Sequence, residues 1–176
     1  MARTTTDIEA RIQRLEDIEA IRDLAVRYGF AVDERDFDAI VALFSPDGCL
    51  RTNAGVIKGQ GFDGVGAYFR NHLPNLGPSN HFVHGHVVDF GEDPDRATGV
   101  VSSHAEMWRM GAPMITAMRY TDEYRRVDGN WRFQERIQSY MYFVDVRDYA
   151  EALGSRLRVR SNRDNPQPAD WPGLFT

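Results

Sequence analysis

The sequence predicts an α+β domain in which helices cover one face of a curved antiparallel sheet. Three observations lead to this fold class. Apolar residues recur at helical spacing up to Leu73, the spacing changes to strand-like alternation after Gly77-Pro78, and short turn sequences separate the alternating segments. Helices followed by a strand meander are typical of this class. The chain of 176 residues has the usual length of one domain and suffices for a substantial core.

The first thirty residues are expected to form one long helix. Thr6 and Glu9 make the T-x-x-E pattern of a capping box, which marks a helix start. Apolar residues then follow at intervals of three and four, and a helix with such a stripe has to pack against another element. These residues are Ile8, Ile12, Leu15, Ile18, Ile21, Leu24, Tyr28 and Val32.

Two shorter helices are expected next. Asp36 is placed to cap a helix over "DFDAIVALF", which ends at residues 45–48, Ser-Pro-Asp-Gly. A third helix over "DGVGAYFRNHL" has Asp63 as a plausible cap. The residues that these two helices would bury are Phe37, Ile40, Val41 and Phe44 in the first, and Val65, Tyr68, Phe69 and Leu73 in the second.

Four strands are expected at about 80–90, 97–109, 114–126 and 131–143. The last two are separated by "VDGN", whose Asp-Gly pair favours a two-residue hairpin. One domain is therefore predicted over residues 1–150. Residues 151–176 contain three of the prolines and are expected to form an extended tail, with Trp171 and Phe175 as anchors on a neighbouring surface.

The composition, with 42% hydrophobic and 27% charged residues, is that of a globular protein. A formal net charge of -5 argues against nucleic-acid binding. The basic stretch "SRLRVRSNR" is interpreted as a solvated or subunit-contacting tail, with phosphate binding as the alternative. No apolar run is long enough to span a membrane and no signal peptide is recognised, so a cytoplasmic protein without a membrane partner is expected. The single Cys49 excludes an intrachain disulfide and is expected to fill buried space.

The stretch "NHFVHGH" places His81, His84 and His86 close together. Three imidazoles could bind zinc. On a regular strand, however, His84 and His86 share one face and His81 points to the other, unless a bulge intervenes. The only further histidine on a comparable strand is His104, so no metal is expected. Hydrogen-bonded or exposed polar roles are expected for His84 and His86, and the role of His81 stays open.

Other nucleophile and nucleotide-binding motifs are absent: the chain contains no GxSxG, no GxxxxGK[ST], and no GxGxxG after a strand. Acid–base chemistry by ordinary side chains remains. Asp33 lies where the first helix ends and is either a cap or a functional carboxylate. Alternation in "WRFQERIQSYMYF" puts Arg136 on a mixed polar and aromatic face, which suits either a pocket lining or solvent.

Three stretches together carry a resemblance to a known family. In order, "RLEDIEAIRDLAVRYGFAVDERDFDAIVALFSPDG", "NHFVHG" and "YTDEYRRVDGNWRFQER" resemble the SnoaL-like branch of the nuclear transport factor 2-like superfamily. The resemblance covers roughly residues 8–145. Within the family the chain is most similar to hexachlorocyclohexane dehydrochlorinase and bile acid 7α-dehydratase, with scytalone dehydratase more distant. It implies a cone-shaped α+β barrel with helices packed on a curved sheet around a cavity.

The resemblance also implies a catalytic set. His81 corresponds to the general base, Asp33 to the aspartate that orients it, Tyr28 to a pocket tyrosine and Arg136 to a pocket arginine. No cofactor is implied. Residues expected to contact the substrate are Tyr140, His104, Trp108 and Phe82.

The function expected from this set is a cofactor-independent lyase that eliminates water or another small group from a small hydrophobic cyclic or aromatic compound. The same residues would also serve a retro-aldol carbon–carbon lyase, an isomerase or a polyketide-type cyclase. A noncatalytic binding or scaffold subunit is the alternative from another class. Relatives imply a homo-oligomer, a trimer or dimer formed through the sheet.

Overall fold

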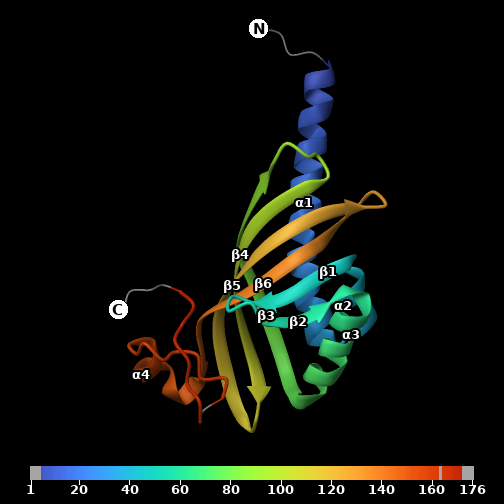
Figure 1. Ribbon diagram of the computed structural model, residues 1–176. Coiled ribbons are helices and arrows are strands. Elements are labelled where there is room, and N and C mark those ends of the chain that lie inside the picture. The colour runs from blue at the N-terminus through green and yellow to red at the C-terminus, as the bar shows by residue number, and fades with distance from the viewer. Residues whose placement is uncertain (1–4, 163, 172–176) are drawn as a thin grey trace.

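A computed structural model describes residues 5–162 and 164–171 of the chain. Three helices cover the concave side of one curved six-stranded sheet (Figure 1). In chain order the main elements are α1 (Thr5–Glu34), α2 (Phe37–Ala42), β1 (Phe44–Thr52), β2 (Ile57–Gln60), α3 (Gly61–His72), β3 (Leu76–Phe90), β4 (Arg96–Arg109), β5 (Ala112–Val127) and β6 (Asn130–Asp145). The expected α+β class is confirmed.

The three predicted helices are confirmed with small shifts of their ends. The Asp36 side chain accepts a hydrogen bond from the Ala39 backbone N–H at 2.9 Å and so caps α2 as expected. The third helix starts two residues before Asp63, at Gly61. The cap expected from the side chain of Thr6, and the anchor expected at Phe175, lie outside the described part of the chain.

The sheet is mixed, whereas the sequence predicted an antiparallel one. Its strand order is β2-β1-β6-β5-β4-β3, and every neighbouring pair is antiparallel except β1 with β6, which is parallel. The segment of β1, "FSPDGCLRT", contains Pro and Gly and shows no alternation, so β1 is not among the four strands expected. The hairpin at Asp128-Gly129 has φ angles of 49° and 77°, as the predicted two-residue turn requires.

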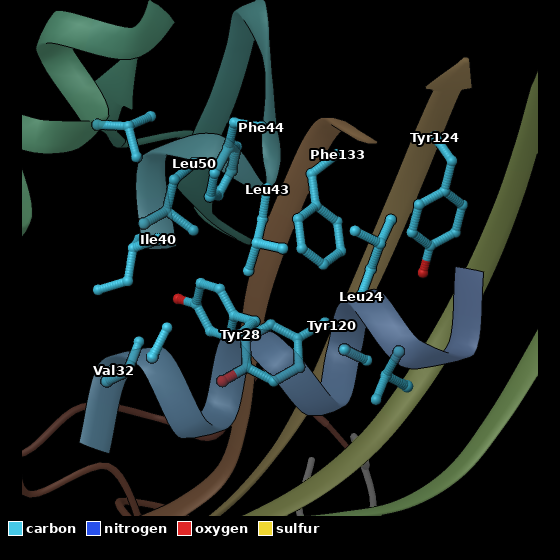
Figure 2. Packing of buried hydrophobic residues seen from close by; sticks show 14 of the residues in the cluster. Leu24, Tyr28, Val32, Ile40, Leu43, Phe44, Leu50, Tyr120, Tyr124 and Phe133 are labelled. Atoms are coloured by element: carbon cyan, nitrogen blue, oxygen red, sulfur yellow. The ribbon is translucent and has the colours of Figure 1, made fainter. Parts of the chain in front are cut away.

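Only the second half of α1 belongs to the core. Ile21, Leu24, Tyr28 and Val32 are buried and pack with aromatic residues of the sheet (Figure 2). The stripe continues toward the N-terminus, but there it is exposed, because α1 projects past the end of the sheet (Figure 1). The exposed fractions are 45% for Ile8, 50% for Ile12 and 65% for Leu15, so the periodicity was right and the expected burial of these three was wrong.

A buried carboxylate fixes α1 to the sheet near the middle of the helix. One oxygen of Asp17 accepts hydrogen bonds from the indole N–H of Trp131 at 3.1 Å and from Arg126 at 2.9 Å. Burial alone would raise the pKa of Asp17, but these bonds lower it below its ordinary value. Asp17 therefore joins the helix to β5 and β6 as an ionised acceptor.

The C-terminal segment packs along β6 where β1 ends. Phe143 exchanges backbone hydrogen bonds with Arg158 and Arg160 at 2.9 and 2.7 Å, so the edge of β6 is covered. Arg158 is buried and donates to the carbonyl of Met141 at 2.9 Å, which contradicts the solvated or subunit-contacting role expected for this arginine, whereas Arg156 is exposed. The ring of Trp171 lies 3.8 Å from the guanidinium of Arg119 in β5 of the same chain.

The expected boundary at residue 150 falls within a short helix, α4 (Tyr149–Leu153). Among residues 5–162 and 164–171, no helix combines the length and apolar character that crossing a membrane would require. The cytoplasmic location expected from the sequence stays a prediction.

Replacing Asp17 with alanine is expected to lower the free energy of unfolding by about 1–3 kcal/mol, because the buried Trp131 N–H loses its acceptor. Asp23→Ala is the matched control, since Asp23 pairs with Arg27 on the exposed face of the same helix and should contribute less than about 0.5 kcal/mol. Urea unfolding measures both. Equal losses in the two variants would mean that Asp17 does not fix the helix to the sheet.

Candidate active site

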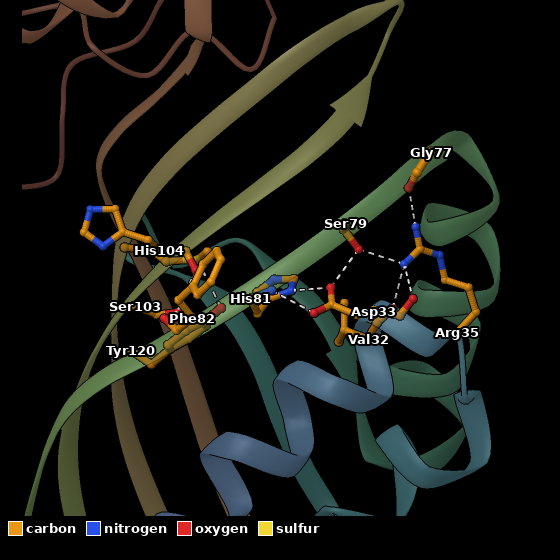
Figure 3. Close-up of polar contacts among 11 residues, drawn as sticks. Val32, Asp33, Arg35, Gly77, Ser79, His81, Phe82, Ser103, His104 and Tyr120 are labelled. Carbon is orange, nitrogen blue, oxygen red and sulfur yellow. Dashed lines mark hydrogen bonds and ion pairs between the residues drawn. The ribbon is translucent and has the colours of Figure 1, made fainter.

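The predicted pair Asp33 and His81 meets in the structure. Asp33 lies in the last turn of α1 and His81 in β3, and the two are 48 positions apart in the chain. Oδ1 of Asp33 is 2.7 Å from Nδ1 of His81, and Oδ2 accepts the backbone N–H of His81 at 2.7 Å (Figure 3). The side chains are only 13% and 11% exposed. Both oxygens of the carboxylate thus hold the same residue, which fixes the imidazole plane.

Two neighbours of the pair explain how α1 reaches β3. Gly29 faces His81, and a Cβ on Gly29 would lie 3.2 Å from the Cβ of His81, so the absence of a side chain allows the close approach. Arg35 has a left-handed φ of 62° and turns the chain at the helix end. Its guanidinium donates to the carbonyl of Asp33 and to the hydroxyl of Ser79, both at 2.8 Å (Figure 3).

The electrostatics favour an ionised Asp33. Burial alone would raise the pKa of Asp33, but hydrogen bonds from the His81 ring, the Ser79 hydroxyl at 2.7 Å and the His81 backbone lower it below its ordinary value. An ionised carboxylate can only accept, so Nδ1 of His81 carries the proton. The other ring nitrogen, Nε2, is then the one free to take up a proton.

His81 lines a cavity of about 390 Å³ between the helices and the sheet. This volume lies in the range of small-molecule sites. One part of the wall is apolar and aromatic, and is formed by Tyr28, Val32, Phe69, Leu73, Met118 and Tyr120. Other lining residues are polar and include Lys58, His72, Arg109 and Gln138. Such a cavity can pack a ring against its aromatic side chains and bind polar substituents through its polar ones.

Tyr28 and Tyr140 line the cavity as expected, and Tyr120 joins them. Burial raises the pKa of Tyr28 well above its ordinary value and raises that of Tyr140 to about 12. Burial raises the pKa of Tyr120 as well. All three phenols are therefore neutral near pH 7. The hydroxyl of Tyr120 donates to Sδ of Met118 at 3.1 Å, and that of Tyr140 to Oε1 of Gln138 at 3.5 Å.

Arg136 lies behind the aromatic wall and is not among the residues that line the cavity. Its side chain is 1% exposed, and its guanidinium carbon is 3.8 Å from the ring centre of Tyr120 and 4.3 Å from that of Tyr28. Its Nε is 3.5 Å from Oδ1 of the buried Asp122. The expected contact between Arg136 and a substrate is thus blocked by two tyrosine rings, through which its charge can still act.

The other histidines depart from the regular strand pattern. A bulge between Val83 and His86 inserts one extra residue opposite β4, so His86 returns to the inner face that His81 occupies. His86 Nε2 is 2.9 Å from the hydroxyl of Tyr124. His84 points to the outer face, where its Nε2 is 2.9 Å from Nδ1 of His104. The expectation that His84 and His86 share a face is therefore wrong. It held only for a strand without a bulge, and β3 has one.

Three residues expected to bind substrate lie on the outer face of the sheet. Phe82 pairs with His104 across β3 and β4, and Trp108 follows on the same face of β4. Figure 3 shows His104 pointing away from His81. From this position none of the three can contact a molecule inside the cavity, so only Tyr140 of the expected substrate-binding set is brought to it.

Several cavity residues were missed by the sequence reading. Lys58 comes from the four-residue strand β2 and Arg109 from the end of β4, next to a turn. His72 stands in the last turn of α3, stacked on Tyr68 with ring centres 5.2 Å apart. Short strands and the ends of elements show no periodicity, so the sequence pattern could not identify these residues as cavity residues. Their basic charge was the one available signal. Within the described ranges no group of three or more His, Cys, Asp or Glu side chains is arranged for a metal ion.

Comparison with known structures identifies the class of fold. An NTF2-like protein with a cystatin-like fold from Novosphingobium aromaticivorans is 25% identical, with a TM-score of 0.65 over 88% of this chain and 99% of that one. A hexachlorocyclohexane dehydrochlorinase, LinA-type3, from Novosphingobium barchaimii is 22% identical, with a TM-score of 0.70 over 77% and 94%. A candidate scytalone dehydratase from Novosphingobium aromaticivorans is 19% identical, with a TM-score of 0.69 over 75% and 89%. These similarities place the chain in the NTF2-like, cystatin-fold class.

The family follows from the sequence itself. The family model of the SnoaL-like domain matches residues 13–137, which is more than half of the chain. The protein therefore belongs to the SnoaL-like family. No functionally curated protein sequence matches the chain significantly.

The pH dependence of stability is expected to reflect the burial of His86. Burial lowers the pKa of His86 to about 4 from an ordinary value of 6.5, so between pH 6.5 and 4 the unfolded chain binds a proton that the folded chain does not. Stability should therefore fall as the pH drops through this window. One pKa unit corresponds to about 1.4 kcal/mol, and with allowance for partial exposure His86 should contribute about 1–3 kcal/mol.

Unfolding of the wild type and His86→Gln at pH 7 and pH 5 measures this contribution. Burial raises the pKa of Asp122 to about 6, and this carboxyl acts in the opposite direction between pH 6 and 4 in both proteins. The difference between the two proteins therefore isolates His86. The same loss of stability on acidification in both would contradict the assignment.

Proposed function

We propose that this protein is a cofactor-independent lyase that eliminates water or another small group from a small hydrophobic cyclic or aromatic compound. The observation that carries the proposal is the Asp33–His81 pair facing a cavity with an aromatic wall. A histidine held by a buried carboxylate and open to a small cavity is suited to proton transfer at neutral pH. Two similar structures bear the names of eliminating enzymes, a dehydrochlorinase and a candidate dehydratase, which agrees with the proposal.

The reaction begins with proton removal by His81. The proton on Nδ1 of His81 stays hydrogen-bonded to Asp33, so Nε2 is the atom that takes a proton from a carbon of the bound ring. As this C–H bond breaks, its electron pair forms the new double bond and the neighbouring bond to oxygen breaks. Asp33 stabilises the imidazolium that results. The proton on Nε2 then passes to the departing hydroxyl, so water leaves and the imidazole returns to its neutral form.

Tyr28 and Tyr120 supply the hydrogen bonds in this scheme. Both phenols stay neutral at pH 7 and line the cavity. Tyr28 can donate to a departing or carbonyl oxygen, and Tyr120 can do so when its hydroxyl turns away from Sδ of Met118. Arg136 acts from behind their rings. Its buried positive charge favours negative charge that develops on the tyrosine side of the cavity, without contact to the substrate.

The dyad is tested by His81→Ala and Asp33→Asn on a panel of cyclic and aromatic hydroxy compounds, with loss of water followed by mass spectrometry. Each variant should lose turnover by a factor on the order of 10² to 10⁴, because the base is absent or its tautomer is wrong. The double variant should have nearly the same turnover as His81→Ala, because Asp33 has no base to orient once His81 is removed.

His84→Ala is the matched control, because it removes the same side chain from the same strand on the opposite face. It should keep full turnover. Thermal melts allow activity to be compared per folded molecule. Normal turnover by His81→Ala would reject the lyase mechanism, and specific ligand binding without any turnover by the wild type would favour a binding protein instead.

We also propose that the chain forms a homo-oligomer, a dimer or trimer, through the outer face of the sheet. This face carries exposed apolar side chains at Phe82, Val87, Val100 and Trp108. Apolar residues gathered on a sheet surface are typical of interaction sites. Light scattering at micromolar concentration should give the mass of an oligomer, and Val100→Asp should lower it. A monomeric wild type would contradict the proposal.

A further inference from the structure

Three basic side chains, each from a different element, line the cavity. Lys58 belongs to β2, His72 to α3 and Arg109 to β4, and all line the cavity that His81 also lines. Burial lowers the pKa of His72, and the positive charges of Arg109 and Lys58 lower it further. The same two charges act on Tyr68. Nζ of Lys58 lies 5.5 Å from the ring centre of Tyr68, on which His72 is stacked, and Arg109 lines the same cavity.

Neither strong base has an acidic partner. Across the described residues, no carboxylate lies within 4.0 Å of Lys58 or Arg109. By contrast, at least one carboxylate pairs with each of Arg27, Arg51, Arg125, Arg126, Arg136, Arg147 and Arg160. Nζ of Lys58 donates to Oε1 of Gln138 at 2.5 Å, and the guanidinium of Arg109 lies 5.4 Å from the ring centre of Phe143. Both contacts leave the positive charges unneutralised.

The acidic groups nearby are otherwise engaged. Asp33 is hydrogen-bonded by His81 and Ser79. Asp170 accepts the backbone N–H of Tyr140 at 2.7 Å. Two partly buried cations without a counter-charge are unfavourable unless an anion binds between them. In a chain with a net charge of -5, this local excess of positive charge runs against the overall composition.

The surroundings indicate a carboxylate rather than a phosphate. A cavity of about 390 Å³ with a largely aromatic wall leaves room for one ring and a small substituent. The helix end at this place is the C-terminus of α3, at His72, and its carbonyls add partial negative charge. A singly charged carboxylate tolerates that charge better than a phosphate dianion. A planar carboxylate also fits the guanidinium fork of an arginine.

We propose that Lys58 and Arg109 bind a carboxylate, and that the substrate is a cyclic or aromatic carboxylic acid whose ring lies toward His81. Its identity as substrate rests on the proposed lyase function, whereas carboxylate binding by the two bases does not. The two charges fix one end of the molecule, so the ring is held in one orientation before proton removal. Neutral compounds of the same shape lack this attachment.

Binding of benzoate and cyclohexanecarboxylate, compared with benzamide and cyclohexanecarboxamide, tests the proposal by titration calorimetry or chemical-shift titration of the whole chain. The carboxylates should bind about tenfold or more tightly than the amides, because charge-assisted hydrogen bonds replace neutral ones. Added salt should weaken only the carboxylates.

Lys58→Gln and Arg109→Gln should each reduce carboxylate affinity about tenfold and leave amide affinity unchanged. Lys58→Arg, which keeps the charge, should retain carboxylate binding even if Lys58→Gln folds poorly. Arg27→Gln is the control, since Arg27 is exposed on α1 and pairs with Asp23. It should bind like the wild type.

Equal binding of acids and amides, no binding of the acids, or unchanged acid affinity in both Gln variants would overturn the proposal. Tighter binding of phenyl phosphate than of benzoate would overturn the choice of a carboxylate. His81→Ala separates this proposal from the lyase function, because it should retain the preference for acids while turnover is lost. Turnover of neutral compounds only, with no preference for acids, would leave the lyase function standing and reject the carboxylate site.

Discussion

The carboxylate of Asp33 is the contact on which the rest of the site depends. It joins the last turn of α1 to β3 by holding both the ring and the backbone N–H of His81. The contact needs the close approach that Gly29 allows and the chain turn that Arg35 makes. Because Arg35 also binds Ser79, the residues that end the helix orient the strand that carries His81, the proposed base. The contacts that end α1 therefore also set the geometry of the proposed site.

A second constraint comes from the buried charges beneath the aromatic wall. Arg136 and Asp122 form an ion pair among tyrosine rings, and Tyr124 donates to Asp122 at 2.9 Å. Such a pair is stable only while both partners are present. Tyr28 belongs to the hydrophobic core and to the cavity wall at once. A substitution that alters the packing around Tyr28 therefore also alters the electrostatics of the cavity.

The sequence predicted those parts of the fold that repeat with a period. Helices α1 to α3, the long strands β3 to β6 and the Asp-Gly hairpin follow from spacing and turn residues, and the resemblance located Asp33 and His81. What failed has local causes. Periodicity in α1 cannot reveal where the sheet beneath it ends, so Ile8 was expected to be buried. The bulge before His86 reversed a face assignment. Lys58 and Arg109 come from a short strand and a turn, where no pattern distinguishes a cavity residue from a solvated one.

The parallel pairing of β1 with β6 has a consequence for how the protein is made. The strand formed by residues 44–52 acquires its central neighbour only when residues 130–145 have been synthesised, and Ser161 adds to the cavity wall later still. Nascent chains emerge from the ribosome at about 5–20 residues per second, and contacts between distant segments form late. For that interval α1 and the hairpins expose the aromatic face that will become the wall. The cavity wall is therefore complete only after residue 161 has left the ribosome, so the site forms after the sheet around it.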